Sequence, residues 1–291
     1  MNGLLVLDKP SGMTSHDVVY AVRRATGEKS VGHLGTLDPM ATGVLPLLLG
    51  KWTRLAQFFS ASEKVYTGSI RFGWATDTYD AEGTQTGEAA PLSLGLTELQ
   101  KLALHFAGEM EQMPPVFSAK KIGGVPAYKL ARAGKEVPVK PARIFIHSFV
   151  LIGLEGDVAS FEMHVSAGGY VRSVAHELGQ MAGCGAHLES LRRTRAGDFS
   201  LKQSLTLDAM SALAGCGELE AALPHPRTLL QQLPCVTADE AAASRLRNGM
   251  SVNLPEFSQA PLVKIFTGPR DLVGVGKRIA GTLIQPFVNL A

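Results

Sequence analysis

One fourteen-residue stretch, Gly32–Leu45 (GHLGTLDPMATGVL), constrains the fold of this chain more than any other. It combines three glycines, a proline, a histidine and a single carboxylate, and it runs directly into an apolar segment. Glycine permits tight turns and close approach to the backbone, and proline biases the preceding residue away from the helical region. The stretch therefore predicts a stiff loop that holds Asp38 beside a buried strand, Val44–Leu49. From these residues alone, the Asp38 carboxylate either only stabilises the turn by bonding a nearby backbone N–H or has a functional role.

Hydrophobic patterns before this loop predict a strand and a helix. Leu4–Leu7 is a short apolar run ahead of turn residues, as expected of a strand. Residues Ser15–Ala25 have helical apolar spacing, with Ser15 as the N-cap and Gly27 as the stop signal.

After the loop, alternation predicts several strands. Lys64–Gly73 alternates with Tyr66 on its apolar side, so Tyr66 is either a core aromatic or a site residue. Thr97–Gln100 has the form of a capping box and predicts the start of a helix. Arg143–Leu154 and Ala159–Val165 both alternate and predict a hairpin.

Charge is unevenly distributed along the chain. The formal net charge of the 291 residues is only +2, but Ala119–Arg143 holds five lysines, two arginines and one glutamate, a local charge of +6. Such a basic segment on a nearly neutral body is the footprint of a nucleic-acid binder, or else a solvated lysine-rich loop.

Composition favours a reduced, membrane-free setting. The chain is 45% hydrophobic, enough for a sizeable core, but no apolar run reaches the roughly 18 residues of a membrane span. The first residues lack the pattern of a signal peptide. The three cysteines form no CxxC pair, so we expect reduced thiols and a cytoplasmic location.

Three partial motifs fail to predict a metal or cofactor. His176–Gln180 begins like HExxH, but Gln180 stands where the second histidine is required. Gly50–Trp52 lacks the spacing and hydroxyl residue of a phosphate-binding loop, and the glycine pair at Gly274 and Gly276 lacks a third glycine. The eight histidines show no ligand clustering along the sequence, so we expect no metal and no cofactor.

Gly32–Leu45 closely resembles the central motif of the TruB family, the tRNA pseudouridine synthases that act on the T-loop uridine at position 55. The opening GLLVLDKPSGMTS is similar to the first motif of that family, and SAGGYVRS to a later one. In this later motif Val165 stands where cysteine is usual and Gly169 where threonine is usual. These departures concern supporting backbone, because Tyr170 and Arg172 are retained.

The resemblance implies catalytic roles for Asp38, Tyr66 and Arg172. Asp38 is the residue that matches the essential aspartate, acting either as a nucleophile or as a base toward the ribose. Tyr66 would stack on the flipped base, and Arg172 would keep the carboxylate ionised. The leucine of Leu191–Arg193 would line the site, and its arginines would face RNA. The further substrate-binding residues implied are His33, Asp80, Lys120, Lys121, Tyr170, Leu191 and Arg192.

The family resemblance also implies a domain organisation. Residues 1–225 would form the catalytic domain, with an RNA-gripping insertion at about 112–143. Residues 230–291 resemble a PUA-like RNA-binding module, a small β-barrel with short strands at Leu246–Gly249, Leu262–Ile265 and Leu272–Gly276. The implied fold class is α+β, a pseudouridine synthase fold with a mixed, largely antiparallel sheet flanked by helices.

The function implied is isomerisation of the tRNA uridine at position 55 to pseudouridine, with tRNA as the partner and no cofactor. We expect a monomer with no obligatory protein partner. One alternative is a tRNA-folding chaperone that acts mainly by binding. Another is a guide-RNA-dependent synthase of the dyskerin type, against which the long basic insertion argues.

Overall fold

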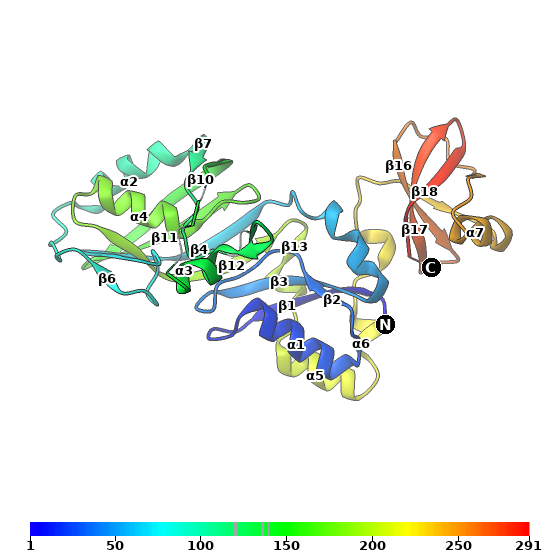
Figure 1. Cartoon of the computed structure of the whole chain (residues 1–291), viewed down its shortest axis with the longest axis horizontal. Coiled ribbons are helices and arrows are strands. Elements are labelled where there is room, and N and C mark those ends of the chain that lie inside the picture. Colours follow the sequence, from blue (N-terminus) through cyan, green and yellow to red (C-terminus); the bar gives the residue numbers. More distant parts are fainter. Residues whose placement is uncertain (119–120, 135–136, 139, 291) are drawn as a thin grey trace.

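The computed structural model describes residues 1–118, 121–134, 137–138 and 140–290. A large body is built on a nine-stranded sheet, and a smaller body on a five-stranded sheet (Figure 1). The expected fold class is confirmed, since the large sheet is mixed but mainly antiparallel and carries helices.

The large sheet has the strand order β1-β3-β12-β4-β11-β10-β7, with β2 added to β3 and β13 to β12. All neighbouring strands are antiparallel except β3 and β12, which meet in a short parallel register. The strands are β1 (Gly3–Lys9), β2 (Val31–His33), β3 (Thr42–Leu49), β4 (Lys64–Phe72), β7 (Gly108–Gln112), β10 (Ala142–Glu155), β11 (Val158–Val165), β12 (Ala186–Ala196) and β13 (Phe199–Ser200).

Four helices cover one face of this sheet. Helices α2 (Leu96–Ala103) and α4 (Val171–Met181) lie over one half, and α1 (Ser15–Thr26) and α5 (Leu207–Gly215) against the other (Figure 1). All four contribute buried side chains to the main core. The opposite face is covered at β1 and β3 by the 3₁₀ helix η1 (Gly50–Phe58), but β10 exposes apolar side chains there.

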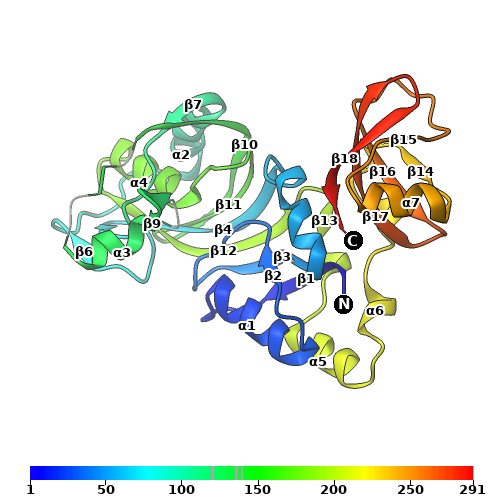
Figure 2. The same cartoon turned by 45° about the vertical axis from the view of Figure 1, so that its right-hand side comes forward.

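The smaller body has the strand order β14-β16-β17-β18-β15 and a core of its own. Its elements are β14 (Cys235–Thr237), α7 (Glu240–Arg247), β15 (Val252–Asn253), β16 (Leu262–Thr267), β17 (Asp271–Ala280) and β18 (Leu283–Asn289). Side chains of Val275, Val288 and Leu290 pack in one cluster with Leu4 and Val6 of β1. The two bodies therefore meet near both ends of the described chain (Figure 2).

The remaining elements are short and connect the main ones. They are β5 (Ala75–Thr76), β6 (Gln85–Thr86), η2 (Leu104–Phe106), β8 (Lys121–Ile122), β9 (Val125–Pro126), α3 (Ala127–Arg132), η3 (Leu201–Gln203), α6 (Leu219–Ala222) and η4 (Pro226–Thr228). None of the helices in the described ranges is long and apolar enough to cross a membrane.

Most predicted elements are confirmed, but the predicted starts of two helices are wrong. The N-cap of α1 is Thr14, not Ser15, because Thr14 and Asp17 form the reciprocal capping box. Helix α2 is capped at Gly95, whose N–H donates to the Glu98 carboxylate, so the box does not begin at Thr97.

The small body contains one further correction. Leu246 and Arg247 end the helix α7 and are not in a strand. Asp239 caps this helix, and its side chain accepts from the N–H of Ala242. The strands predicted at Leu262–Ile265 and Leu272–Gly276 are confirmed as parts of β16 and β17.

Candidate active site

A cavity of about 250 Å³ opens between the loop before β3, the start of β4 and the N-terminus of α4. It brings together residues that are far apart in the sequence. Its lining is Gly35, Thr36, Leu37, Asp38, Lys64, Tyr66, Gly168, Gly169, Tyr170, Val171, Arg172, Leu191 and Arg193.

Lys9 fixes the Asp38 loop from one side. Its side chain is fully buried, and Nζ donates to the carbonyl oxygens of Pro10, Met13 and Pro39 at 2.8, 2.5 and 3.1 Å. The Ser15 hydroxyl adds a reciprocal pair with Leu37, donating to its carbonyl and accepting from its N–H. The residues on both sides of Asp38 are therefore tied to the β1–α1 turn.

Arg193 fixes the same loop from the other side. Its guanidinium donates to the carbonyls of Val44, Thr36 and Gly35 at 2.7, 3.3 and 3.0 Å, and the residue is only 1% exposed. Gly43 makes this approach possible. It has φ +106°, and a Cβ there would lie 2.2 Å from the backbone oxygen of Arg193. This contact requires glycine.

Arg172 connects the loop to a second carboxylate. Its Nε lies 3.0 Å from Asp38 Oδ2, its Nη2 donates to Asp38 Oδ1 at 3.2 Å, and its Nη1 lies 3.3 Å from Asp80 Oδ2. It also donates to the carbonyls of Thr78 and Phe117. The side chain is buried, so its position is fixed by charge and by hydrogen bonds together.

Burial and charge act against one another at Asp38. Desolvation in the cavity raises the pKa of Asp38 above the usual carboxyl value of 3.8, while Arg172 lowers it and Asp80 raises it further. The net direction is upward. The side chain is still 32% exposed, which leaves the carboxylate open to a molecule in the cavity.

The rest of the wall is mainly apolar and aromatic. Tyr66 and Leu191 are each 8% exposed and line the cavity from β4 and β12. Tyr170 joins them from the start of α4, and both of its backbone groups are bonded by the Gln112 side chain. Lys64 adds a positive charge, and burial lowers its pKa to about 8.

The structure brings together Asp38, Tyr66, Tyr170, Arg172 and Leu191 as lining residues. Asp80 does not line the cavity but lies behind it, with its Oδ2 3.3 Å from Arg172 Nη1.

Two other predicted site residues lie elsewhere. His33 is in β2 and does not line the cavity. Arg192 pairs with Asp8, with the two closest atoms 2.7 Å apart. Lys120 lies outside the described residues, and the side chain of Lys121 is not described either.

Sequence reasoning missed Lys9 and Lys64, and it assigned Arg193 to RNA. The expectation that Arg193 faces RNA is wrong, because the residue is buried and its guanidinium donates hydrogen bonds to backbone carbonyls. Adjacent residues of a strand face opposite sides, so Arg192 and Arg193 could have been separated once the strand β12 was recognised.

The histidines also differ from the expectation. Within the described ranges, His147 and His164 gather with Glu63 on the face of the sheet opposite Tyr66. His176, from the failed zinc motif, stacks instead on Tyr79 with ring centroids 3.8 Å apart.

Two family models match the chain. Residues 23–171 match the N-terminal domain of the TruB family pseudouridylate synthases, and residues 172–225 match the tRNA pseudouridylate synthase B C-terminal domain.

Curated relatives match the chain over most or nearly all of its length. The tRNA pseudouridine synthase B of Solibacter usitatus (strain Ellin6076) is 45% identical, with 99% of each chain covered. That of Syntrophotalea carbinolica (strain DSM 2380 / NBRC 103641 / GraBd1) is 46% identical over 74% of this chain and 70% of the relative. Among solved structures, a Cbf5-Nop10-Gar1 complex contains a chain with TM-score 0.70 and 25% identity, covering 99% of this chain and 85% of that one.

Proposed function

Because the chain belongs to the TruB family of pseudouridylate synthases, we propose that it isomerises the T-loop uridine at position 55 of tRNA to pseudouridine. The observation that supports this most directly is the Asp38 carboxylate, held by buried Arg172 at the wall of a cavity that Tyr66 also lines.

The chemistry is an isomerisation in which no atoms are gained. The bond between ribose C1′ and uracil N1 breaks, the base turns, and C1′ bonds to C5. The proton on C5 is then lost, and N1 takes one up. Because a stacked base cannot be reached inside folded RNA, the uridine must first be flipped into the protein.

We assign the first step to Asp38, as a nucleophile at the ribose or as a base toward it. The carboxylate must be ionised for either role, and Arg172 favours the ionised form. Arg172 itself is positioned by Asp80 and by two carbonyls, so it presents a fixed cation to the reacting carboxylate.

We assign the base-binding wall to Tyr66, Tyr170 and Leu191. A flipped base that stacks on an aromatic ring gains about 1–3 kcal/mol, and the apolar leucine excludes water beside it. The Tyr66 hydroxyl is the group we assign to help remove the C5 proton. Lys64, also at the wall, offers a cation for a backbone phosphate of the flipped nucleotide.

We propose that tRNA is also gripped outside the cavity. The basic segment Ala119–Arg143, with Lys120 and Lys121, would contact phosphates, and residues 230–291 would act as a PUA-like RNA-binding module beside a catalytic domain of residues 1–225. Phosphate contacts release counterions on binding. Replacing Lys120 and Lys121 by alanine should therefore weaken tRNA binding and flatten its salt dependence.

The test of the catalytic assignment is Asp38→Asn, assayed by tritium release from C5-labelled tRNA and by tRNA binding. Release should be abolished while binding is kept. The matched control is Asp208→Asn, which changes an exposed aspartate in the first turn of α5 and should leave release unchanged. Release by Asp38→Asn at the wild-type rate would refute the role of Asp38.

We further propose that the chain works in the cytoplasm as a monomer without an obligatory protein partner. Purified chain should then modify a bare T-arm RNA, and light scattering should give the mass of one chain, 30.9 kDa. A requirement for a guide RNA or a second protein would contradict this.

A further inference from the structure

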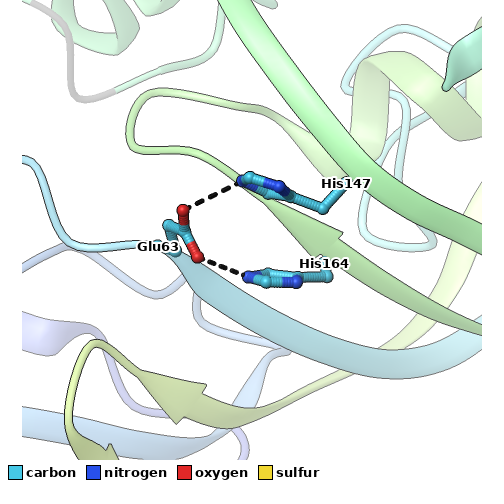
Figure 3. A group of neighbouring side chains, drawn as sticks. All are labelled: Glu63, His147 and His164. Atoms are coloured by element: carbon cyan, nitrogen blue, oxygen red, sulfur yellow. Dashed lines mark hydrogen bonds and ion pairs between the residues drawn. The ribbon is translucent and has the colours of Figure 1, made fainter. Parts of the chain in front are cut away.

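Three side chains with metal-binding groups meet on the open face of the large sheet. The two carboxylate oxygens of Glu63 each face one imidazole: Oε1 lies 3.0 Å from His147 Nε2, and Oε2 lies 2.7 Å from His164 Nε2 (Figure 3). The two rings stack with their centroids 4.4 Å apart. One ligand atom from each residue lies within 4.8 Å of the other two.

Strand register places these residues on one face. His164 of β11 pairs with Val65 of β4, and Arg195 of β12 pairs with Val65 from the other side. Glu63 precedes Val65 by two residues and therefore shares its side of the sheet. Tyr66, the next residue of β4, points to the other side, where the active-site cavity lies.

His147 is brought to this face by an irregularity in β10. The pairing of β10 with β11 shifts between Ile146 and Ser148, so His147 lies at a bulge. Bulges redirect a side chain relative to regular alternation. Here the redirected ring stacks on His164 and reaches the same carboxylate.

Two neighbours of His164 require opposite protonation states of the same ring nitrogen. His164 Nε2 faces Glu63 Oε2 and also lies 3.2 Å from Arg195 Nη2. Facing the carboxylate requires a proton on Nε2, whereas accepting from the guanidinium requires a lone pair there. One ring nitrogen cannot do both. A lone pair on Nε2 would suit a cation that lies between the ring and the carboxylate.

From this geometry we propose that Glu63, His147 and His164 bind a divalent transition metal ion of the zinc type. Two imidazole nitrogens and a carboxylate form a three-ligand set that zinc accepts, with the fourth position left to water. The side chains are 24–45% exposed, so an ion can enter from solvent.

Arg195 opposes the ion and has room to move away. Its side chain is exposed, and together with Glu63 it lines a cavity of about 370 Å³. Its positive charge beside His164 lowers the affinity for a cation.

The ion would join the start of β4 to β10 and β11 on the side away from Asp38. Its effect is therefore on stability, by linking three segments, and not on the isomerisation. The proposal rests on this cluster alone and holds whether or not the proposed function is correct.

The test is zinc titration of the full chain by calorimetry, with any histidine tag removed. Because Cys216 and Cys235 are exposed thiols, both are first changed to serine. We expect one zinc ion per chain and a thermal midpoint that rises with zinc. Magnesium should not bind, because it prefers oxygen ligands.

Four variants complete the test. His147→Ala and His164→Ala should each weaken zinc binding about 100-fold, since even the loss of a supporting residue costs 10–100-fold. The control His105→Ala changes an exposed histidine that is not part of the cluster, and it should bind zinc as the parent does. Arg195→Ala removes no ligand and should bind zinc roughly tenfold more tightly, which distinguishes the site from misfolding.

No zinc binding by the parent, or equal binding by the parent and both His147→Ala and His164→Ala, would overturn the proposal. Weaker or unchanged binding by Arg195→Ala would overturn the placement of the ion.

Discussion

Replacing Asp38 by asparagine should stabilise the protein while abolishing its activity, whereas the same replacement at Asp80 should destabilise it. Both carboxylates contact Arg172, so the two variants are matched. They differ in what else holds them. Asp80 Oδ1 accepts from the Thr78 hydroxyl at 2.6 Å and from the N–H of Glu82 at 3.1 Å, and its side chain is 5% exposed.

The sign of the stability change at Asp38 follows from the direction of its pKa shift. Burial raises the pKa of Asp38 in the folded protein above its value of 3.8, so the folded state disfavours the ionised form. Removing the charge should therefore raise the free energy of unfolding. Single stabilising substitutions commonly contribute about 0.5–2 kcal/mol, and we expect a gain of that order.

At Asp80 the expected change in the free energy of unfolding has the opposite sign. Asparagine loses charge-assisted hydrogen bonds in a buried position and weakens the hold on Arg172, which together cost about 2–4 kcal/mol. For a chain of this size, 1 kcal/mol corresponds to roughly 2–4 °C in thermal midpoint. Calorimetry at neutral pH should thus give Asp38→Asn a higher thermal midpoint than the wild type and Asp80→Asn a clearly lower one.

The pH dependence gives an independent check of the sign. Above the folded pKa of Asp38 the wild type carries the full ionisation penalty in its folded state. Between that pKa and 3.8 the folded state binds more protons than the unfolded state, so the penalty shrinks as pH falls. The gain in stability of Asp38→Asn over the wild type should therefore be largest at neutral pH and decrease toward acid pH. A variant less stable than wild type at neutral pH would refute the reasoning.

Three further outcomes are expected. The single-turnover rate of isomerisation should fall as the pH drops through a midpoint above 3.8, because protonation of Asp38 removes the reacting carboxylate; a midpoint at or below 3.8 would contradict the raised pKa. Arg193→Met should lower the free energy of unfolding by about 3 kcal/mol or more in urea titrations, since three carbonyls lose their donor. Arg192→Met should cost at most about 1 kcal/mol, because the Arg192 side chain, which pairs with Asp8, is 40% exposed. Gly43→Ala should destabilise by more than about 3 kcal/mol in the same titrations, because its Cβ would meet the Arg193 backbone; a change within 1 kcal/mol would show that the strands can separate.

Local patterns predicted the strands well because alternation reflects burial directly. Lys64–Gly73 and the hairpin before Val165 were found this way. Helix starts were less certain, since Thr14 and Ser15 are both good caps and only the reciprocal contact with Asp17 distinguishes them. The prediction of a strand at Leu246 is wrong because this residue belongs to a helix of only eight residues, four of them polar.

The candidate site was predicted through motif resemblance, not through local patterns. Nothing near Asp38 in the sequence indicates that Arg172 and Asp80 reach it, since the pairing depends on tertiary structure. The same limit applies to His147 and His164, which lie on neighbouring strands and meet through a bulge that no spacing rule reveals.

The packing of Val288 and Leu290 against Leu4 and Val6 has a consequence for the time course of synthesis. These contacts join residues separated by nearly the whole described chain, and contacts of such long range form late in folding. At roughly 5–20 residues per second, a ribosome needs on the order of tens of seconds to make the residues between them. During that interval the outer side of β1 lacks part of its apolar cover, and the nascent chain is exposed to association with other chains.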